Sequence, residues 1–347
     1  MIKAPMKIIN KTITESSKPF VIAEMSNNHL NDLDRAYRLL DIAKAAGVDA
    51  VKIQTYTADS LTIDCDKSDF VISDPLWQGK SYYDLYQEIT MPVAWNKKLF
   101  DRAFKLGITL FSSPFDAASV DLLEDLNCPA YKIASFEAKD HAFIQKVAST
   151  AKPIIMSTGI SSLMDVQESI VVAQDAGCQD IAILHCVSSY PSDVGNMNID
   201  ALSEFSALGV EIGLSDHSLD NLAAILSVAY GASIIEKHFT ERRVDGGPDA
   251  AFSLEPRELK NLKEQTELAW KAKGSADVLN SQRLGAHHAR SLYFVSDVKK
   301  GELLTPENVR SIRPGFGLEP KLLNQVLGKN ALENIARGTP VSWELIV

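Results

Sequence analysis

The segment that decides the fold is IGLSDHSLDNLAAILSVAYGASIIEKHFT, residues 212–240. In it, an apolar run ends in Ser-Asp-His, a helical pattern ends in the turn Tyr-Gly-Ala, and a second apolar run ends in Glu-Lys-His. Two short β-branched runs joined by a helix predict parallel neighbouring strands, because a parallel connection needs a crossover of this length. The segment is therefore interpreted as one strand–helix–strand unit of an α/β protein.

The same unit recurs along the chain. Short apolar runs alternate with stretches of helical periodicity, and eight runs can be counted, at residues 19–26, 50–56, 108–114, 130–136, 153–159, 181–187, 211–217 and 232–239. Eight units within about 275 residues match the parallel (β/α)8 TIM barrel. We therefore predict this barrel as the main domain.

One connection is longer than the others. Residues 57–107 separate the second and third runs and contain Trp77, Tyr82, Tyr83 and Tyr86. A segment this long in a compact barrel is usually functional. It is interpreted either as a lid over the barrel mouth or as a helix that packs there for stability.

The periodicity ends after the last predicted helix. Residues 276–289 are polar and contain a glycine and two adjacent histidines, which is typical of a linker. Short strands and turns rich in Gly and Pro follow. The predicted organisation is thus a TIM-barrel domain at 1–275, a linker at 276–289 and a small β-rich domain at 290–347.

Composition and charge restrict the class of protein. Of the 347 residues, 46% are hydrophobic and 23% are charged, which indicates a globular chain. The 35 basic and 45 acidic residues give a net charge of −10, which disfavours nucleic acid and anionic membranes as partners. The sequence has no apolar stretch near the roughly 20 residues that span a bilayer and no secretory signal pattern, so we expect a cytoplasmic protein. The four cysteines lack C-x-x-C spacing, which argues against a zinc ribbon.

Polar side chains gather where the predicted strands end, which is the edge of a barrel that carries the active site. Lys52 and Lys132 lie within otherwise apolar runs, where an unpaired ammonium is costly. They are interpreted as partners of Glu24 or Glu137, as a clamp for a phosphate group, or as the Schiff-base lysine of an aldolase. The phosphate clamp is favoured because hydroxyls that donate to an anion lie at the same edge, on Ser113, Ser135, Ser157 and Ser215.

Histidines end three of the predicted strands. His217 follows Asp216, His238 follows Glu236 by two residues, and His185 ends the sixth strand. Adjacent strands lie about 5 Å apart, so His217 and His238 can hold one divalent ion while the carboxylates bind it or orient the rings. An ion with open positions polarises a carbonyl oxygen, and mixed nitrogen and oxygen donors suit manganese, cobalt or zinc better than calcium.

Short sequence motifs along nearly the whole chain resemble those of the sialic acid synthase family. Enzymes of this family condense phosphoenolpyruvate with an N-acylated amino sugar to give a nonulosonic acid. In the barrel the motifs are IAEMSNNH (22–29), AVKIQTY (50–56), FSSPFD (111–116), PAYKIASFE (129–137), KPIIMSTG (152–159), ILHCVSSYP (183–191), IGLSDHSLDN (212–221), EKHFT (236–240) and GGPD (246–249). DVKKGELLTPENV, RPGFGL and IARGTPV resemble the small antifreeze-like (SAF) domain appended to these enzymes.

The resemblance implies roles for the strand-end residues. Glu24 and Glu137 would be the catalytic carboxylates near the reacting carbons. His217 and His238 would hold the catalytic metal, for which Mn²⁺ is expected, with Co²⁺ or Mg²⁺ as alternatives. The phosphoenolpyruvate pocket would consist of Lys52, Ser113, Lys132, Ser135, Ser157 and Ser215.

The resemblance also implies which residues contact the sugar and how two copies of the chain associate. Asn28, Gln54, Tyr190 and Asp249 would contact the sugar. Family members form homodimers in which the small domain of one chain covers the barrel mouth of the other, so Arg313 would contact the sugar bound to the partner. The expected partners are the two substrates and a second copy of the chain.

Within the family, EMSNNH (24–29), QTYT (54–57) and LWQGKSYYDLYQE (76–88) resemble the branch that converts 2,4-diacetamido-2,4,6-trideoxy-L-altrose into pseudaminic acid. The implied reaction is a transfer in which C3 of phosphoenolpyruvate attacks the sugar aldehyde and phosphate leaves by C–O cleavage. N-acetylneuraminate and legionaminic acid are the alternative products. A metal-dependent barrel hydrolase and a non-enzymatic carbohydrate-binding protein are more distant alternatives, and a hydrolase would leave Lys52 and Lys132 unexplained.

Overall fold

The computed structural model describes residues 5–72, 79–280 and 284–347 of the chain. The chain splits into two compact units, Met1–Gly274 and Ser275–Val347. Each unit has its own hydrophobic core. Trp77, which was predicted to pack at the barrel mouth, lies outside the described residues.

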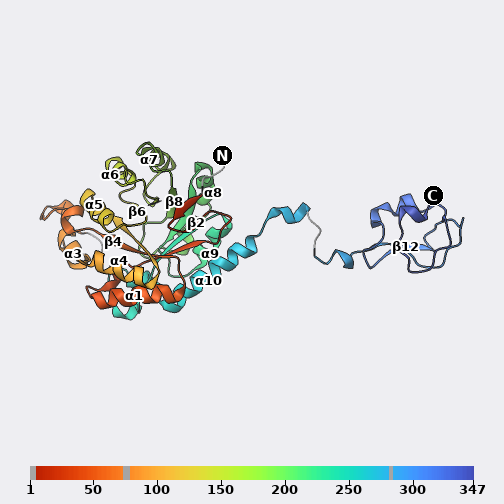
Figure 1. Cartoon of the computed structure of the whole chain (residues 1–347), viewed down its shortest axis with the longest axis horizontal. Coiled ribbons are helices and arrows are strands. Elements are labelled where there is room, and N and C mark those ends of the chain that lie inside the picture. Colours follow the sequence, from red (N-terminus) through yellow and green to blue (C-terminus); the bar gives the residue numbers. More distant parts are fainter. Residues whose placement is uncertain (1–4, 73–78, 281–283) are drawn as a thin grey trace. The chain divides into compact units, whose positions relative to one another are not determined.

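Eight parallel strands form the barrel of the first unit (Figure 1). In chain order they are β3 (Phe20–Glu24), β4 (Ala50–Thr55), β5 (Thr109–Pro114), β6 (Tyr131–Ile133), β7 (Ile154–Ser157), β8 (Ile181–Cys186), β9 (Glu211–Asp216) and β10 (Ile234–His238). Strand β10 pairs with both β9 and β3, which closes the ring. The predicted (β/α)8 barrel is confirmed.

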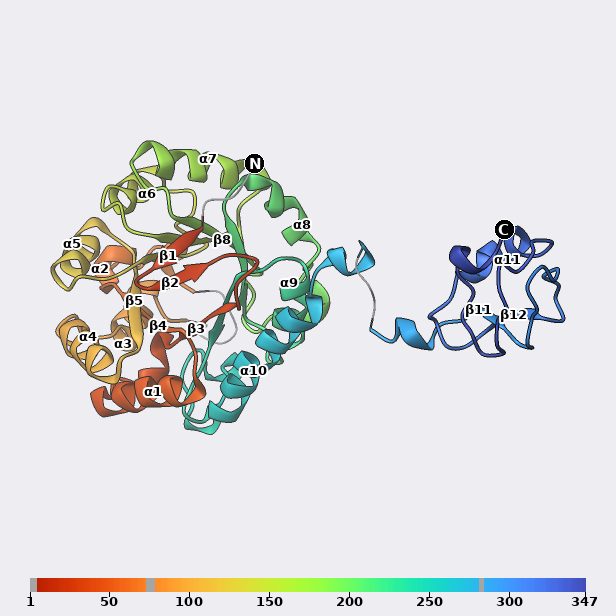
Figure 2. The same ribbon diagram turned by 45° about the vertical axis from the view of Figure 1, so that its right-hand side comes forward.

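Helices surround the strands, as Figure 2 shows. Local signals set their ends: Asp32 accepts a hydrogen bond from the Asp34 N–H at the start of the first outer helix, and Gly47 ends that helix with a positive φ. The helices are α1 (Leu33–Ala46), α4 (Trp95–Leu106), α5 (Ala117–Asp125), α6 (His141–Ala148), α7 (Leu163–Asp175), α8 (Ala201–Phe205), α9 (Leu222–Ala229) and α10 (Pro256–Lys273). Their apolar faces and the strands share one core.

An antiparallel hairpin of β1 (Met6–Ile8) and β2 (Lys11–Ile13) precedes the barrel and was not predicted. Its apolar side chains are buried in the barrel core. Lys11 Nζ lies 2.5 Å from Oδ1 of Asp49, the residue just before β4, so the hairpin lies at the amino-terminal ends of the strands (Figure 2). The carboxyl ends are thereby left as the open mouth.

The long insertion after β4 contains α2 (Ala58–Leu61) and α3 (Tyr82–Ile89) before the chain returns to the outer ring in α4. The two helices contact one another. Because the insertion starts where β4 ends, it lies at the carboxyl mouth of the barrel.

The second unit contains the antiparallel pair β11 (Ser291–Phe294) and β12 (Val309–Ile312) and the short helix α11 (Leu323–Val326). Isolated bridges such as Val298 to Ile335 join the loops between them. Within the described residues of both units, no helix is long and apolar enough to cross a membrane.

Candidate active site

A cavity of about 610 Å³ opens at the carboxyl mouth of the barrel. Its wall on the strand side consists of side chains from strand ends, as expected for this fold. Most of the predicted site residues line it, namely Lys52, Gln54, Lys132, Ser135, Glu137, Ser157, Tyr190, Ser215, His217, His238 and Asp249.

Two lysines and two glutamates form a buried charge cluster at this cavity. Lys52 Nζ lies 3.1 Å from Oε2 of Glu24 and 3.1 Å from Oε1 of Glu236. Lys132 Nζ lies 3.7 Å from the same oxygen of Glu236. The sequence analysis considered Glu236 only as a carboxylate that binds the ion or orients the histidine rings, and did not predict its contacts with the two lysines. Strand alternation could have indicated them, because Glu236 lies two residues before His238 and so faces the same side of β10.

The cluster perturbs the ionisation of its members. Burial raises the pKa of Glu24 to about 7, and the nearby Lys52 ammonium opposes this shift. Burial also lowers the pKa of Lys132, against the opposing effect of Glu236. A carboxyl that titrates near neutral pH can both accept and return a proton during a reaction.

The four predicted serines are buried around the lysines. Lys132 Nζ donates to Ser157 Oγ at 2.6 Å, and Lys52 Nζ is 3.4 Å from Ser113 Oγ. Ser215 Oγ donates to Glu236 Oε1 at 3.2 Å. Together these hydroxyls and ammonium groups form a donor-rich surface suited to a phosphate or a carboxylate.

The turn after β7 contacts one of these serines through a glycine. The Gly159 N–H donates to Ser135 Oγ at 3.0 Å. A Cβ at Gly159 would lie only 2.0 Å from Ser188 Oγ, so any other residue would displace Ser188.

His217 and His238 lie side by side in the cavity, with ring centroids 5.2 Å apart. His217 Nδ1 is 3.2 Å from the Val187 carbonyl oxygen, whereas His238 Nδ1 has no hydrogen-bond partner and lies 3.8 Å from Asp249 Oδ2. Burial, together with the nearby His217 and Lys52, holds the pKa of His238 well below its usual range. A neutral imidazole is the form that binds metal ions.

These donors fit an incompletely enclosed divalent ion. Among the described residues, no group of three or more His, Cys, Asp or Glu side chains is arranged to hold a metal. Two imidazoles from adjacent strands would leave the remaining coordination positions to a substrate. The unpartnered Nδ1 of His238 is the observation that favours such an ion.

Predicted sugar-side residues lie next to the histidines. The Tyr190 ring is 4.5 Å from that of His217. Gln54 Nε2 donates to Glu24 Oε1 and to Ser26 Oγ, both at 3.2 Å. Ser26 Oγ in turn donates to Asp249, so a continuous polar network runs from the charge cluster to this side.

Not every predicted residue reaches the cavity. Glu24 and Ser113 contribute through Lys52, as described above, but are not part of the lining. Asn28, which was predicted to contact the sugar, is fully buried in the turn η1 (Ser26–His29), and its Nδ2 donates to Phe239 O and to Ser253 Oγ, both at 2.8 Å. These bonds fix the turn, and the predicted contact of Asn28 with the sugar stays a prediction. Arg313 is exposed in the second unit, and its predicted contact stays a prediction.

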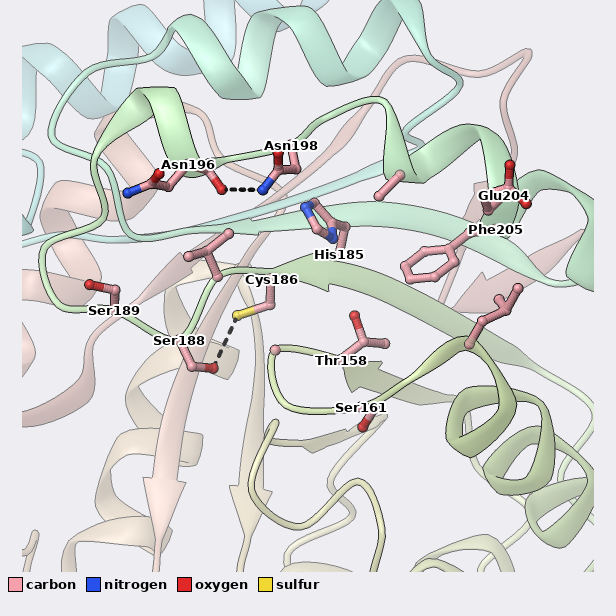
Figure 3. Close-up of a pocket in the computed structure, with 14 residues that line it drawn as sticks. Thr158, Ser161, His185, Cys186, Ser188, Ser189, Asn196, Asn198, Glu204 and Phe205 are labelled. Atoms are coloured by element: carbon pink, nitrogen blue, oxygen red, sulfur yellow. Dashed lines mark hydrogen bonds between the residues drawn. The ribbon is translucent and has the colours of Figure 1, made fainter.

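The side chain of His185 does not point into the central cavity, although this was expected for a residue at a strand end. It lines a second cavity of about 560 Å³ beside β8, shown in Figure 3. His185 Nε2 is 2.7 Å from the Met197 carbonyl oxygen, and the ring packs edge-on against Phe205. The neighbouring Cys186 faces the central cavity. His185 therefore anchors the loop after β8 and is no candidate metal ligand.

The insertion supplies much of the apolar lining of the central cavity, beside Tyr56, Phe115 and Phe136. The insertion residues that line it are Leu61, Ile72, Tyr82, Leu85, Tyr86 and Ile89, and this set is called the apolar wall below. Tyr83, which was predicted alongside them, instead donates its hydroxyl to Asp59 at 3.2 Å.

The fold and the site define a class: a TIM-barrel protein whose mouth holds paired lysines, carboxylates and two histidines, with a small appended domain. The chain belongs to the NeuB family, whose model matches residues 39–278, and residues 289–347 match the SAF domain. The resemblance predicted from the strand-end strings is thereby confirmed.

Relatives with assigned names extend over almost the whole chain. The pseudaminic acid synthase of Helicobacter pylori is 40% identical over 93% of this chain and 96% of its own length. The N,N'-diacetyllegionaminic acid synthase of Campylobacter jejuni is 34% identical over 91% of this chain and 97% of its own length. Among solved structures, the spore coat polysaccharide biosynthesis protein of Bacillus subtilis is 32% identical with a TM-score of 0.67, and 99% of each chain is covered.

Proposed function

We propose that the chain is a synthase that joins phosphoenolpyruvate to an N-acylated amino sugar and releases phosphate. The observation that carries this proposal is the buried cluster of Lys52 and Lys132, surrounded by serine hydroxyls and adjacent to two histidines. Ammonium groups inside a barrel mouth suit a small substrate with both phosphate and carboxylate groups. The family membership supports the same conclusion.

We infer that the sugar is 2,4-diacetamido-2,4,6-trideoxy-L-altrose and that the product is pseudaminic acid. The support is the 40% identity to proteins named pseudaminic acid synthase, compared with 34% to a legionaminic acid synthase. N-acetylneuraminate and legionaminic acid remain the alternative products. Both would arise from the same chemistry with another amino sugar.

In the proposed reaction, C3 of phosphoenolpyruvate forms a bond to the aldehyde carbon of the open-chain sugar, and the aldehyde oxygen takes up a proton and becomes a hydroxyl group. Water adds to C2, and the bond between C2 and the phosphate ester oxygen breaks, so that inorganic phosphate leaves. Lys52 and Lys132 bind the phosphate and carboxylate groups and keep C3 oriented towards the aldehyde.

Either Glu24 or Glu137 would accept the proton of the attacking water. Burial raises the pKa of both groups, which makes each a stronger base than an exposed glutamate. Glu137 lines the cavity, and its Oε2 is buried without a hydrogen-bond partner. Glu24 reaches the cavity through Lys52 and Gln54.

We also propose that His217 and His238 hold a divalent ion, Mn²⁺ in the first place, with Co²⁺ or Mg²⁺ as alternatives. When bound, such an ion supplies Lewis-acid polarisation of a carbonyl oxygen. The Val187 carbonyl occupies Nδ1 of His217 and thereby leaves Nε2 for the ion. From the family resemblance alone, we further propose a homodimer in which Arg313 of one copy contacts the sugar bound to the other.

Isotope labelling tests the reaction. The protein is incubated with a panel of amino sugars and with phosphoenolpyruvate carrying ¹⁸O in the bridging ester oxygen. We expect the 6-deoxy diacetamido sugar to be used best and all label to appear in the released phosphate. Label retained in the sugar acid would exclude C–O cleavage, and the absence of phosphate release with every sugar would refute the proposed function.

Metal removal tests the role of the histidines. After chelation and dialysis, we expect activity to be lost and to return on addition of Mn²⁺. His217→Ala and His238→Ala should bind Mn²⁺ at least about tenfold more weakly. Full activity in demonstrably metal-free protein would contradict this role.

A further inference from the structure

The central cavity has two chemically different halves. The half formed by the strand ends carries the charge cluster, the serines and the histidines. The other half contains the apolar wall, which comes from the insertion after β4, together with Tyr56, Phe115 and Phe136. None of the described insertion residues that line the cavity is charged, although the segment also contains Asp59, Asp84 and Glu88.

Helix α3 places its apolar residues towards the cavity and its charged residues away from it. Tyr82, Leu85, Tyr86 and Ile89 are spaced at i, i+3, i+4 and i+7, which places them on one helical face. That face lines the cavity. Asp84 and Glu88 lie off this face and are exposed. The pattern is that of an amphipathic helix whose apolar side faces the site.

Protein atoms do not fully cover this apolar face. Tyr82 is 38% exposed, and Tyr86 and Ile89 are only half-buried. A helix that served only for stability would bury its apolar stripe against the core. Here Tyr82 and Tyr86 stack with ring centroids 6.1 Å apart, and their uncovered surface borders the cavity. A ligand with apolar groups would complete the burial.

The apolar wall lies nearer the mouth than the charge cluster. Tyr56 packs edge-on against Tyr86 of the wall, with ring centroids 6.2 Å apart. Tyr56 lies four residues after Lys52, which corresponds to roughly 13 Å along an extended strand. A substrate whose reacting carbon meets phosphoenolpyruvate near the lysines would therefore extend its far end towards this wall.

We propose that the apolar wall recognises the deoxygenated end of the sugar, so that the C6 methyl group of a 6-deoxy acylamino hexose packs against Leu61 and Ile89. The inference rests on the proposed function and adds the feature of the sugar that the protein selects. A hydroxyl at C6 would be buried against Leu61 and Ile89, whose side chains offer it no hydrogen bond. Recognition of one methyl group by an apolar pocket gives about 10- to 200-fold discrimination.

The test compares two sugars that differ only at C6. These are 2,4-diacetamido-2,4,6-trideoxyhexose and its 6-hydroxy counterpart of the same configuration, each assayed with saturating phosphoenolpyruvate. In the wild-type protein we expect kcat/KM to be at least about tenfold higher for the 6-deoxy sugar. Leu61→Asn, which is nearly isosteric, and Ile89→Thr, which is one heavy atom smaller, both add polar atoms and should each lower this ratio by about three- to tenfold.

Ile63→Thr is the matched control. It is the same substitution as Ile89→Thr in the same insertion, but Ile63 is exposed and does not line the cavity. We expect it to leave the ratio unchanged. The readout is the ratio of the kcat/KM values for the two sugars, measured on one protein sample. Partial unfolding of a variant lowers both values equally and so does not change the ratio.

The outcomes separate this inference from the proposed function. If the wild type converts both sugars equally well, or if both wall variants keep the wild-type ratio, the inference is overturned while the synthase function stands. If the wild type converts neither of these sugars nor N-acetylmannosamine, the proposed function fails and the inference fails with it.

Discussion

Two buried charge clusters lie on opposite sides of β10, and they differ in how their lysines are held. On the inner side, Glu236 contacts Lys52 and Lys132 over 3.1 and 3.7 Å, and all three residues line the cavity. On the outer side the next residue, Lys237, is completely buried. Its Nζ donates over 2.6 to 2.7 Å to Asp216 Oδ2, Ser218 O and Asp220 O.

The difference separates lysines that are available to bind a ligand from a lysine that stabilises the structure. Lys237 uses all three of its N–H donors on the protein, so nothing remains to bind a substrate. Its partners flank His217, and it therefore positions the loop that carries one candidate metal ligand. The inner lysines have longer contacts with carboxylates, 3.1 to 3.7 Å, and a cavity beside them, so they can exchange a carboxylate for a substrate anion.

The largest expected effect is on stability at the outer cluster. In Lys237→Met the Asp216 carboxylate would stay buried without its counter-ion. Removing one partner of a buried ion pair costs about 3–5 kcal/mol, and we expect a loss of this size in urea-induced unfolding. A loss below 1 kcal/mol would show that Lys237 is not a structural anchor.

Lys263→Met is the control for this prediction. Lys263 also pairs with an aspartate, with its Nζ 2.6 Å from Asp49 Oδ2, but at the amino-terminal end of the barrel. Asp49 keeps a second partner in Lys11. The cost should therefore be only about 1 kcal/mol, and Mn²⁺ binding should be unchanged.

The inner cluster should respond in function, with little change in stability. Lys132→Met removes an ammonium whose pKa is already lowered by burial, while Glu236 keeps its contact with Lys52. We expect kcat/KM for phosphoenolpyruvate to fall about 100-fold, or about 2.7 kcal/mol. The KM for the sugar should change by less than about threefold.

Steady-state kinetics and urea unfolding measured on the same variant check both parts. Lys139→Met, which removes an exposed lysine of the loop after β6, should match the wild type in both measurements. An equal loss for the two substrates of Lys132→Met would argue against a phosphate clamp.

The sequence predicted the inner cluster better than the outer one because of strand alternation. Lys52 and Gln54, or Glu236 and His238, are two residues apart and so share the inner face of a strand. The same rule explains the error at His185, since its neighbour Cys186 reaches the central cavity whereas His185 lines only the second cavity. Applied to every strand, alternation would have excluded His185 and selected Glu236.

Turns and long-range contacts could not be predicted in this way. Asn28 and His29 follow β3, but they lie in a turn, where no periodicity sets the direction of a side chain. The hairpin of β1 and β2 has three-residue strands, too short for a recognisable alternation. Its burial depends on contacts with barrel residues that are distant in the sequence.

The smallest expected effect concerns a buried ionisable group that has no charged partner, in contrast to both clusters. His29 is only 2% exposed, accepts a hydrogen bond from the Asn31 N–H at Nδ1, and packs edge-on against Trp95. Burial lowers the pKa of His29 to about 4, from an ordinary value near 6.5. Between these values the unfolded chain binds a proton that the folded chain does not, so stability is full above pH 6.5 and falls as the pH drops.

This linkage should lower the free energy of unfolding by about 2 kcal/mol between pH 8 and pH 5. In His29→Gln that part of the pH dependence should disappear, whatever the variant's stability at pH 8, because glutamine does not titrate. His141→Gln, at an exposed histidine that begins α6, should keep the wild-type slope. Urea unfolding at several pH values measures the slopes directly. If His29→Gln loses as much stability on acidification as the wild type, other titratable groups cause the loss of stability at low pH. The burial of neutral His29 would then not be its cause.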